Sequence, residues 1–333
     1  MTNEVKTILQ FPTDTVSIDF LDENGEVSMP QTILVFVPGN PGLIHWYAPM
    51  LKEILDQLGP GFSARGLSYA GHGLTKEMTN VEQFEGSSAR NVNVAWTVDG
   101  QIQHKIAYMD ELLRDLVAQW GTMPRFIFLS HSIGSHLVQR MCVLRPDILK
   151  RTILIIHLMP FIRMDAPFSQ QIVLNSVAQH CDSAIMLGRM LLTLMSKLPR
   201  EKVDQLLAKT VPGLDARNVA VDLVRLPTFA RNLFELGGEE IRALPQKTDE
   251  SALRILGSHC RLEILFAAGD QWAPLFHAHD LHDLQQRNLI PKSIEWLFIP
   301  ELKHDYVVHP QMVPPVLEFC IKAIRKVVPK ARL

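Results

Sequence analysis

The sequence predicts an α/β protein with a mainly parallel, doubly wound central sheet flanked by helices, and with a helical cap insertion. Short apolar strands alternate with amphipathic helices up to residue 158, and the alternation resumes after residue 258. The segment between them is rich in Leu and Met and helical in pattern. We therefore expect one core made of residues 1–158 and 259–333, with residues 159–258 inserted as a cap or lid. The length of 333 residues then needs no second independent domain.

Strands are expected where β-branched or aliphatic runs end in turn residues. Residues 32–38 (TILVFVP) form a continuous apolar run, which is typical of a strand buried on both faces of a parallel sheet. The other strands are predicted at 15–20, 62–69, 125–130, 151–158, 261–270 and 293–299. Helices are predicted at 45–58, at 97–120, after residue 134, at 275–288 and from about residue 310.

Charge and cysteine usage exclude several classes of protein. The 33 basic and 35 acidic residues give a net charge of -2, which argues against nucleic acid as a partner. The four cysteines lie far apart and form no CxxC pair, which favours a reducing compartment over a disulfide scaffold or a zinc site. They are Cys142, Cys181, Cys260 and Cys320.

No segment is long and apolar enough to be expected to span a bilayer. The nearest candidate, residues 184–198 (AIMLGRMLLTLMSKL), is interrupted by Arg189 and Lys197. Apolar residues nearly surround this predicted helix, so two interpretations stay open: a cap helix packed over the site, or a helix that faces a lipid surface. The N-terminus shows no signal-peptide pattern.

A candidate nucleophile stands where the strand 125–130 meets the next helix. The elbow Ser130-His131-Ser132-Ile133-Gly134 places Ser132 at a sharp turn, with its hydroxyl exposed above the sheet. The positions two before and two after Ser132 must be small because strand and helix pass close together. Gly134 meets this demand, and Ser130 replaces the usual glycine. His131 is expected to pack beside the turn rather than react.

An acid and a histidine follow Ser132 in the order that this kind of site uses. Asp270 ends the apolar run RLEILFAAGD, and His304 follows the last predicted strand. Both lie in loops at the carboxyl ends of strands, where functional groups of open α/β sheets collect. We expect Ser132 to attack an acyl carbon, His304 to carry its proton and Asp270 to orient the imidazole. His309 is a competing histidine, but it precedes a proline and is expected to open the last helix.

The loop after the strand 32–38 is expected to complete an oxyanion hole. It reads PGNPG, and Asn40 would donate its backbone N–H alongside that of Ile133. The glycines fit an ordinary turn equally well, so the assignment depends on the position of the loop.

At this point the residues resemble the lipid droplet-associated hydrolase family within the α/β-hydrolase superfamily, over nearly the whole chain. The resemblance rests on VFVPGNPGLIHWY (35–47), AGHG (70–73), DGQIQHKIAYMDEL (99–112) and SHSIG (130–134), and QIQHK (101–105) is its most diagnostic part. It implies an α/β-hydrolase fold and a serine esterase or lipase associated with cytosolic lipid droplets. It also implies a nucleophile, an acid and a base at Ser132, Asp270 and His304. The departures are Ser130 and the charged Asp305 beside the histidine.

Other polar residues are expected to be structural. His277, His279 and His282 lack the aspartate that a metal-binding HxHxDH motif has before its third histidine, so we expect solvated surface histidines. His104 and Lys105 are expected in a structural polar network beneath the sheet.

The expected function is a serine carboxylic-ester hydrolase that acts on lipid esters through an acyl-enzyme intermediate and needs no metal or organic cofactor. It is expected to be cytoplasmic and peripheral on a lipid droplet or membrane surface. The C-terminal Ala331-Arg332-Leu333 resembles a peroxisomal address and is the alternative location. Two alternative functions stay open: a lipid-surface organising protein with little turnover, and an acyl-CoA thioesterase that uses the same triad.

Overall fold

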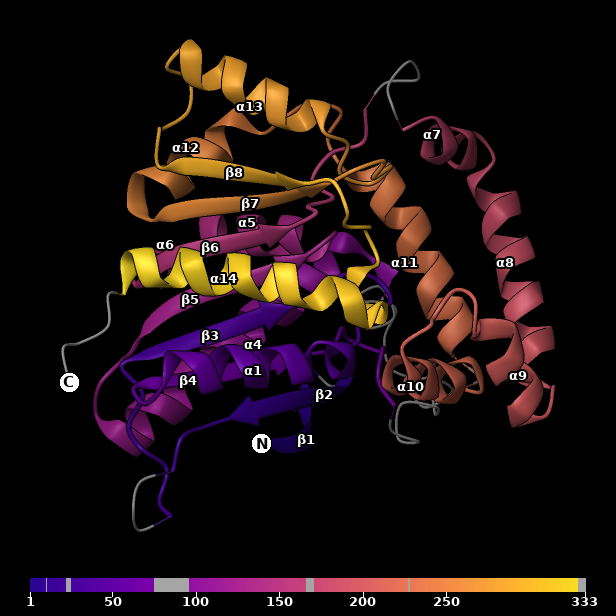
Figure 1. The fold of residues 1–333 in the computed structure, drawn as a ribbon, viewed down its shortest axis with the longest axis horizontal. Helices are drawn as coiled ribbons and strands as arrows, with labels where there is room; N and C mark the ends of the chain where they lie inside the picture. The colour runs from indigo at the N-terminus through magenta and orange to yellow at the C-terminus, as the bar shows by residue number, and fades with distance from the viewer. Residues whose placement is uncertain (10, 22–24, 75–95, 166–170, 227, 329–333) are drawn as a thin grey trace.

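The computed structural model describes residues 1–333 except 10, 22–24, 75–95, 166–170, 227 and 329–333. Within the described residues, the centre of the molecule is an eight-stranded sheet (Figure 1). Its strands are β1 (Thr2–Ile8), β2 (Phe11–Ile18), β3 (Thr32–Val37), β4 (Phe62–Leu67), β5 (Arg125–His131), β6 (Thr152–Leu158), β7 (Arg261–Ala267) and β8 (Ile294–Ile299). They lie in the order β1-β2-β4-β3-β5-β6-β7-β8. The pairs from β4 to β8 are parallel, and only β1 with β2 and β2 with β4 are antiparallel, so the predicted mainly parallel sheet is confirmed.

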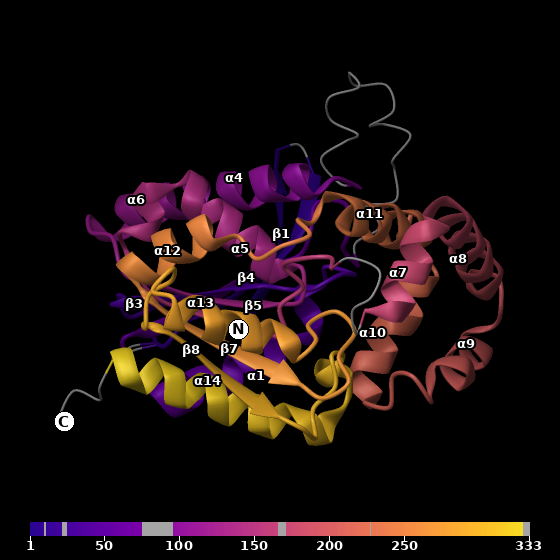
Figure 2. The ribbon, with the colours of Figure 1, turned by 90° about the horizontal axis from the view of Figure 1, so that it is seen from above.

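Helices cover both faces of this sheet. On one face α1 (Ala48–Leu58) packs against α14 (Val313–Val327), and on the other α5 (Gly134–Leu144) packs against both α4 (Val98–Trp120) and α12 (Glu250–His259). Figure 2 shows these two layers above and below the strands. The short α6 (Pro146–Leu149) follows α5, and α13 (Phe276–Gln286) connects β7 to β8. The helices predicted at 97–120 and 275–288 are thus present within a residue or two.

A second group of helices lies beyond the carboxyl ends of the parallel strands (Figures 1 and 2). It consists of α7 (Ile172–Gln179), α8 (Cys181–Ser196), α9 (Arg200–Leu207), α10 (Leu214–Val224) and α11 (Phe229–Ala243). The described part of residues 159–258 contains no strand, as its Leu/Met-rich pattern predicts. Its last helix, α12, packs against α5 on the face of the sheet rather than within this second group.

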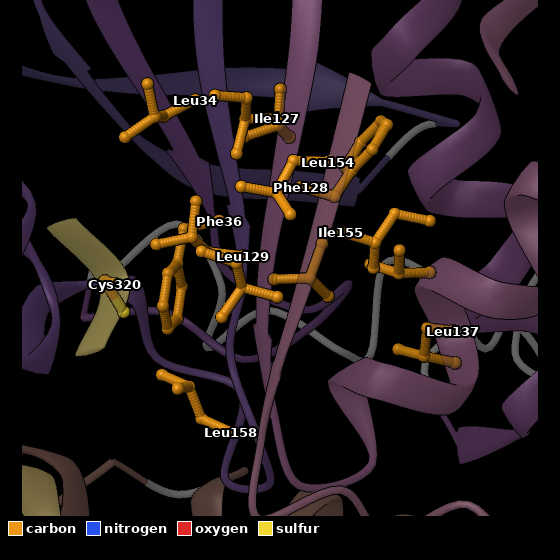
Figure 3. Packing of buried hydrophobic residues seen from close by; sticks show 14 of the residues in the cluster. Leu34, Phe36, Ile127, Phe128, Leu129, Leu137, Leu154, Ile155, Leu158 and Cys320 are labelled. Atoms are coloured by element: carbon orange, nitrogen blue, oxygen red, sulfur yellow. The ribbon is translucent and has the colours of Figure 1, made fainter. Parts of the chain in front are cut away.

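The core forms where the strands are buried on both faces. All six residues of β3 are buried, as the continuous apolar run of 32–38 predicts. Figure 3 shows the side chains of β3, β5 and β6 packed between Leu137 of α5 and Cys320 of α14. Because Leu34, Ile127 and Phe128 are completely inaccessible to water, the central strands are held rigidly where β5 ends at the elbow.

The edge strand β1 was not predicted from the sequence. Its residues TNEVKTI are almost all exposed, so it has no apolar face to give a pattern. It exists because its backbone pairs with β2 from Thr2↔Ser17 to Ile8↔Phe11.

Within the described residues no helix is long and apolar enough to cross a membrane, and the four cysteines are buried and free.

Candidate active site

The elbow holds Ser132 in a conformation that few side chains adopt. Ser132 has φ of 53°, and its backbone N–H donates to the carbonyl of Leu158 on the neighbouring strand at 3.1 Å. A Cβ at Gly134 would lie 2.4 Å from the carbonyl oxygen of Pro38 and 2.5 Å from that of Val37. Only glycine fits there, because α5 starts directly against the end of β3. The size requirement predicted for this position therefore has a specific steric cause.

The structure brings Ser132, His304 and Asp270 together from three separate loops. His304 Nε2 lies 2.9 Å from Ser132 Oγ, and His304 Nδ1 lies 2.8 Å from Asp270 Oδ2. Ser132 follows β5, Asp270 follows β7 and His304 follows β8, so all three stand at the carboxyl edge of the sheet. The geometry is that of a nucleophile, a base and an orienting acid in series.

Asp270 is held as a carboxylate in spite of complete burial of its side chain. Burial opposes ionisation, but the neighbouring imidazole of His304 and two backbone N–H groups outweigh it, so the pKa of Asp270 is lowered. Those N–H groups belong to Trp272 and Ala273, which donate to Oδ1 at 2.8 and 3.1 Å. The other oxygen, Oδ2, is thereby directed to His304 and fixes the orientation of the ring.

The loop after β3 lies directly against Ser132. A Cβ at Gly39 would be 2.7 Å from the Cβ of Ser132, so the backbone at Gly39 and Asn40 passes over the elbow. Ile133 begins the N-terminus of α5. In the part of the chain that the structure describes, the backbone N–H groups of Asn40 and Ile133 have no protein acceptor. The side chain of Asn40 points elsewhere and donates to the carbonyl of Leu233 at 3.2 Å.

Ser130 forms a buried polar network instead of merely occupying the place of glycine. The strand register pairs Ser130 with His157 of β6, and Ser130 Oγ lies 2.6 Å from His157 Nδ1. The same hydroxyl contacts Ser135 Oγ at 3.2 Å, and Gln139 contacts the other ring nitrogen of His157 at 3.2 Å. Burial lowers the pKa of His157 to about 3, so its ring is neutral and accepts or donates within this network.

Among the described contacts, neither His131 nor His309 joins the triad. His131 Nδ1 contacts the hydroxyl of Tyr47 and His131 Nε2 contacts the backbone carbonyl of His304, both at 2.8 Å. His309, the competing base, lies 3.2 Å from Asp305 instead of near Ser132. Asp305 thus lies beside His309, with its side chain 56% exposed.

An apolar cavity of about 310 Å³ opens beside the triad. Trp272 forms one wall, and its ring centroid lies 5.8 Å from that of His304. Ala184 and Ile185 of α8 and Phe234 of α11 also line it. Asn40 also lines this cavity, so the cavity extends to the loop that passes over Ser132. Such a lining suits an apolar chain rather than a charged group.

The outer side of α8 is an apolar surface. Met186 is 70% exposed and Leu194 is 55% exposed, and Leu187, Met190 and Leu191 are exposed to similar extents. Cys181 and Ile185 are buried on the other side of the helix, which packs against α11. This helix has a cavity on one side and exposed apolar residues on the other, so both interpretations of residues 184–198 stay predictions.

The histidine-rich segment 277–282 corrects one prediction. His279 and His282 are exposed as expected, but His277 is 3% exposed and contacts Asp165 Oδ2 at 2.6 Å. The prediction of a solvated residue is wrong for His277, because α13 turns this position towards the loop after β6. No group of three or more potential ligands among the described residues could hold a metal ion.

The predicted network of His104 and Lys105 is present. His104 Nε2 lies 2.8 Å from Thr13 Oγ1, and Lys105 Nζ lies 3.0 Å from His104 Nδ1 and 3.3 Å from the carbonyl of Ser68. Burial holds the pKa of Lys105 well below its usual range. These contacts join α4 to β2 and to the end of β4, away from the triad.

Comparison with known proteins identifies the family. A family model described as lipid-droplet associated hydrolase matches residues 30–307. The chain belongs to the lipid-droplet associated hydrolase family. It is 25% identical over 290 residues to the lipid droplet-associated hydrolase of Pongo abelii, covering 85% of this chain and 82% of that protein. It is 26% identical over 262 residues to the lipid droplet-associated hydrolase of Homo sapiens, covering 77% and 75%.

Solved structures similar to this family member show its fold. An α/β-hydrolase enzyme from a Medee basin deep-sea metagenome library aligns with a TM-score of 0.56 and 12% identity, over 99% of this chain and 98% of that one. A carboxylesterase structure from Nitrososphaera gargenis aligns with a TM-score of 0.56 and 16% identity, over 98% and 100%. The chain therefore has the α/β-hydrolase fold, and by family and fold it is a hydrolase.

Sequence reasoning missed several residues of the site of this hydrolase. Tyr47 and His157 reach the elbow from the N-terminus of α1 and from β6. The ring of Trp272 lies beside that of His304, and its backbone N–H donates to Asp270. For His157, the local sign of a special role was that a histidine stands inside the apolar run 151–158. Tyr47 and Trp272 carry no such sign, because their roles depend on which loops meet in space.

Proposed function

We propose that this chain is a serine carboxylic-ester hydrolase that acts on lipid esters at the surface of lipid droplets. The observation that carries the proposal is the continuous series from Ser132 Oγ through His304 to Asp270, with contacts of 2.9 and 2.8 Å. Those distances allow a proton to pass from the hydroxyl to the imidazole while the carboxylate stabilises the imidazolium.

The reaction follows from these positions. Ser132 Oγ attacks the acyl carbon while His304 Nε2 takes its proton, and the N–H groups of Asn40 and Ile133 stabilise the oxyanion. The intermediate collapses when His304 returns the proton to the leaving alcohol, which leaves an acyl ester on Ser132. Water activated by His304 then releases the carboxylic acid and restores the serine.

The cavity beside the triad supports a lipid ester as the substrate. Its walls of Trp272, Ile185 and Phe234 would bury an acyl chain, and they offer no partner to a charged group. The exposed apolar side of α8 supports a lipid surface as the partner, since about five large apolar side chains there would leave water on contact with lipid. The names of the relatives in Pongo abelii and Homo sapiens support the droplet as that surface.

A fluorophosphonate probe tests the chemistry. Purified protein should be labelled at Ser132 alone, as mapped by peptide mass spectrometry, and Ser132→Ala should not be labelled. Hydrolysis of esters with acyl chains of increasing length should follow the labelling. A folded wild-type protein that neither labels nor hydrolyses any ester would refute the proposal and favour a lipid-surface protein with little turnover.

Flotation with artificial droplets tests the surface. The triple variant Leu187→Gln/Leu191→Gln/Leu194→Gln should bind droplets of triglyceride and phospholipid much less than wild type. The double variant Leu144→Gln/Leu297→Gln changes exposed apolar residues elsewhere and should bind normally. Ser132→Ala should also bind normally, because its hydroxyl is not part of α8. Equal binding by all variants would refute a role for α8.

A further inference from the structure

A chain of hydrogen bonds outside the triad joins Tyr47, the elbow and the loop after β8. The hydroxyl of Tyr47 lies 2.8 Å from His131 Nδ1. The loop over the elbow approaches the same nitrogen, because a Cβ at Gly39 would lie 3.0 Å from it. His131 Nε2 lies 2.8 Å from the backbone carbonyl of His304. The chain therefore runs from Tyr47, through the residue before Ser132, to the backbone of His304.

The direction of every bond in this chain is determined. A carbonyl oxygen only accepts, so His131 Nε2 carries the proton that it donates to His304. In a neutral imidazole the other nitrogen, Nδ1, must then accept, so Tyr47 donates its O–H to it. Reversing one bond would set two acceptors against each other in a buried site.

The surroundings keep His131 in this neutral form. Its side chain is buried, and burial together with the nearby His304 lowers the pKa of His131 to about 3. Tyr306 meets the His131 ring edge-on at 5.3 Å, and the His304 ring lies 5.0 Å away. The ring is thus fixed by packing as well as by its two hydrogen bonds.

We propose that Tyr47 and His131 are positioning residues that hold the base His304 in register with the nucleophile and with the oxyanion loop. The inference rests on the proposed function, because it assigns His304 its role there. Asp270 fixes the rotation of the His304 ring, whereas the bond from His131 fixes the backbone from which the ring projects. Without that bond the backbone of the loop after β8 would lose its hydrogen bond to the elbow.

Misplacement of His304 should affect one step more than the others. Proton delivery to the leaving alcohol depends strongly on distance when the leaving group is an alkoxide, and much less when it is a stable phenolate. Loss of positioning should therefore slow alkyl esters more than nitrophenyl esters that carry the same acyl chain. A loss of folded enzyme would slow both esters equally.

The test compares three variants, each of which removes polar atoms in or beside the His131 ring. Tyr47→Phe removes the donor to His131, and His131→Phe removes both bonds while keeping a ring. Tyr306→Phe is the matched control, because its hydroxyl donates to Met50 Sδ at 3.8 Å and, among the described residues, takes no part in the chain. The number of active sites in each preparation is counted by fluorophosphonate titration, and kcat and KM are measured for both esters.

We expect Tyr47→Phe and His131→Phe to lower kcat per active site by about 10- to 100-fold on the alkyl ester, with a smaller loss on the nitrophenyl ester and little change in KM. Tyr306→Phe should stay within about twofold of wild type on both esters. Equal losses on both esters, or values for Tyr47→Phe that match Tyr306→Phe, would overturn the inference while wild-type turnover still upheld the proposed function. Wild-type protein no more active than Ser132→Ala would overturn the proposed function itself, and this inference with it.

Discussion

Glu240 gives a sharp prediction because it is a buried carboxyl that the reaction does not use. It lies on α11 and is 2% exposed, and its Oε1 has no partner among the described residues. Burial raises the pKa of Glu240 from 4.5 to about 8, opposed by a hydrogen bond with the side chain of Asn40. The protonated form is therefore the form that the fold accommodates at neutral pH.

The sign and size of the effect follow from this pKa. The folded chain holds the proton more tightly than the unfolded chain, so the neutral carboxyl's contribution to stability is fully present below the unfolded pKa of 4.5 and is lost as the pH rises to about 8. A pKa rise from 4.5 to about 8 corresponds to a loss of roughly 5 kcal/mol in the free energy of unfolding. Above about pH 8 the loss is constant.

Glu240→Gln replaces the neutral carboxyl by an amide of the same shape that does not titrate. Urea unfolding of wild type and variant at a series of pH values gives the difference between their free energies of unfolding. The free energy of unfolding of the variant, relative to that of wild type, should rise by roughly 3 to 5 kcal/mol between about pH 5 and pH 8. It should not change further above that pH. Glu239→Gln, the matched control, changes a neighbour on α11 whose side chain is 30% exposed and stays in contact with water. A difference for Glu240→Gln that is flat with pH, or equal to that of Glu239→Gln, would refute the reasoning.

Three further predictions concern the site and the cavity. Asp270→Asn should lower kcat by about 10⁴-fold with little change in KM, because the ring of His304 loses the acceptor that sets its tautomer; an unchanged kcat would show that another group orients the ring. Gly134→Val should lower the free energy of unfolding by about 3 kcal/mol or more, measured by urea unfolding, because its Cβ would lie within 2.5 Å of two backbone carbonyl oxygens that cannot move aside. Ala184→Phe should fill part of the cavity and lower kcat/KM for long-chain esters much more than for short ones, whereas Met190→Phe on the exposed side of α8 should not change this ratio. A ratio that Ala184→Phe leaves unchanged would mean that the acyl chain binds elsewhere.

Much of the fold could be predicted because its signals are local. After Thr32, the run 33–38 is apolar at every position because β3 is buried on both faces. The helix at 97–120 has an N-cap in Thr97, whose hydroxyl accepts from Gly100 N–H. Turn residues bound the strands whose ends carry Asp270 and His304, so the edge where these residues meet followed from the parallel order of the strands.

The remaining features depend on contacts between distant segments. His277 is buried against Asp165, which lies 112 positions earlier in the chain, and no local pattern marks such a pair. The partner of Ser130 is His157 because of the register between β5 and β6, which adjacent residues do not encode. The strand β1 has no apolar face and forms only because β2 offers it a free edge.

The order of residues along the chain was sufficient to predict the elbow at Ser132 and the acid and histidine that follow it. Each of the three lies at the end of a strand that the adjacent residues define. Only the folded arrangement decided what holds them in place. Tyr47 reaches His131 across 84 positions and His131 reaches the backbone of His304 across 173, and both contacts exist because sheet order brings the ends of β3, β5 and β8 to one edge. Hydrogen bonds act over about 3 Å of space whatever the separation in sequence, so their partners are known only once the strands are in position.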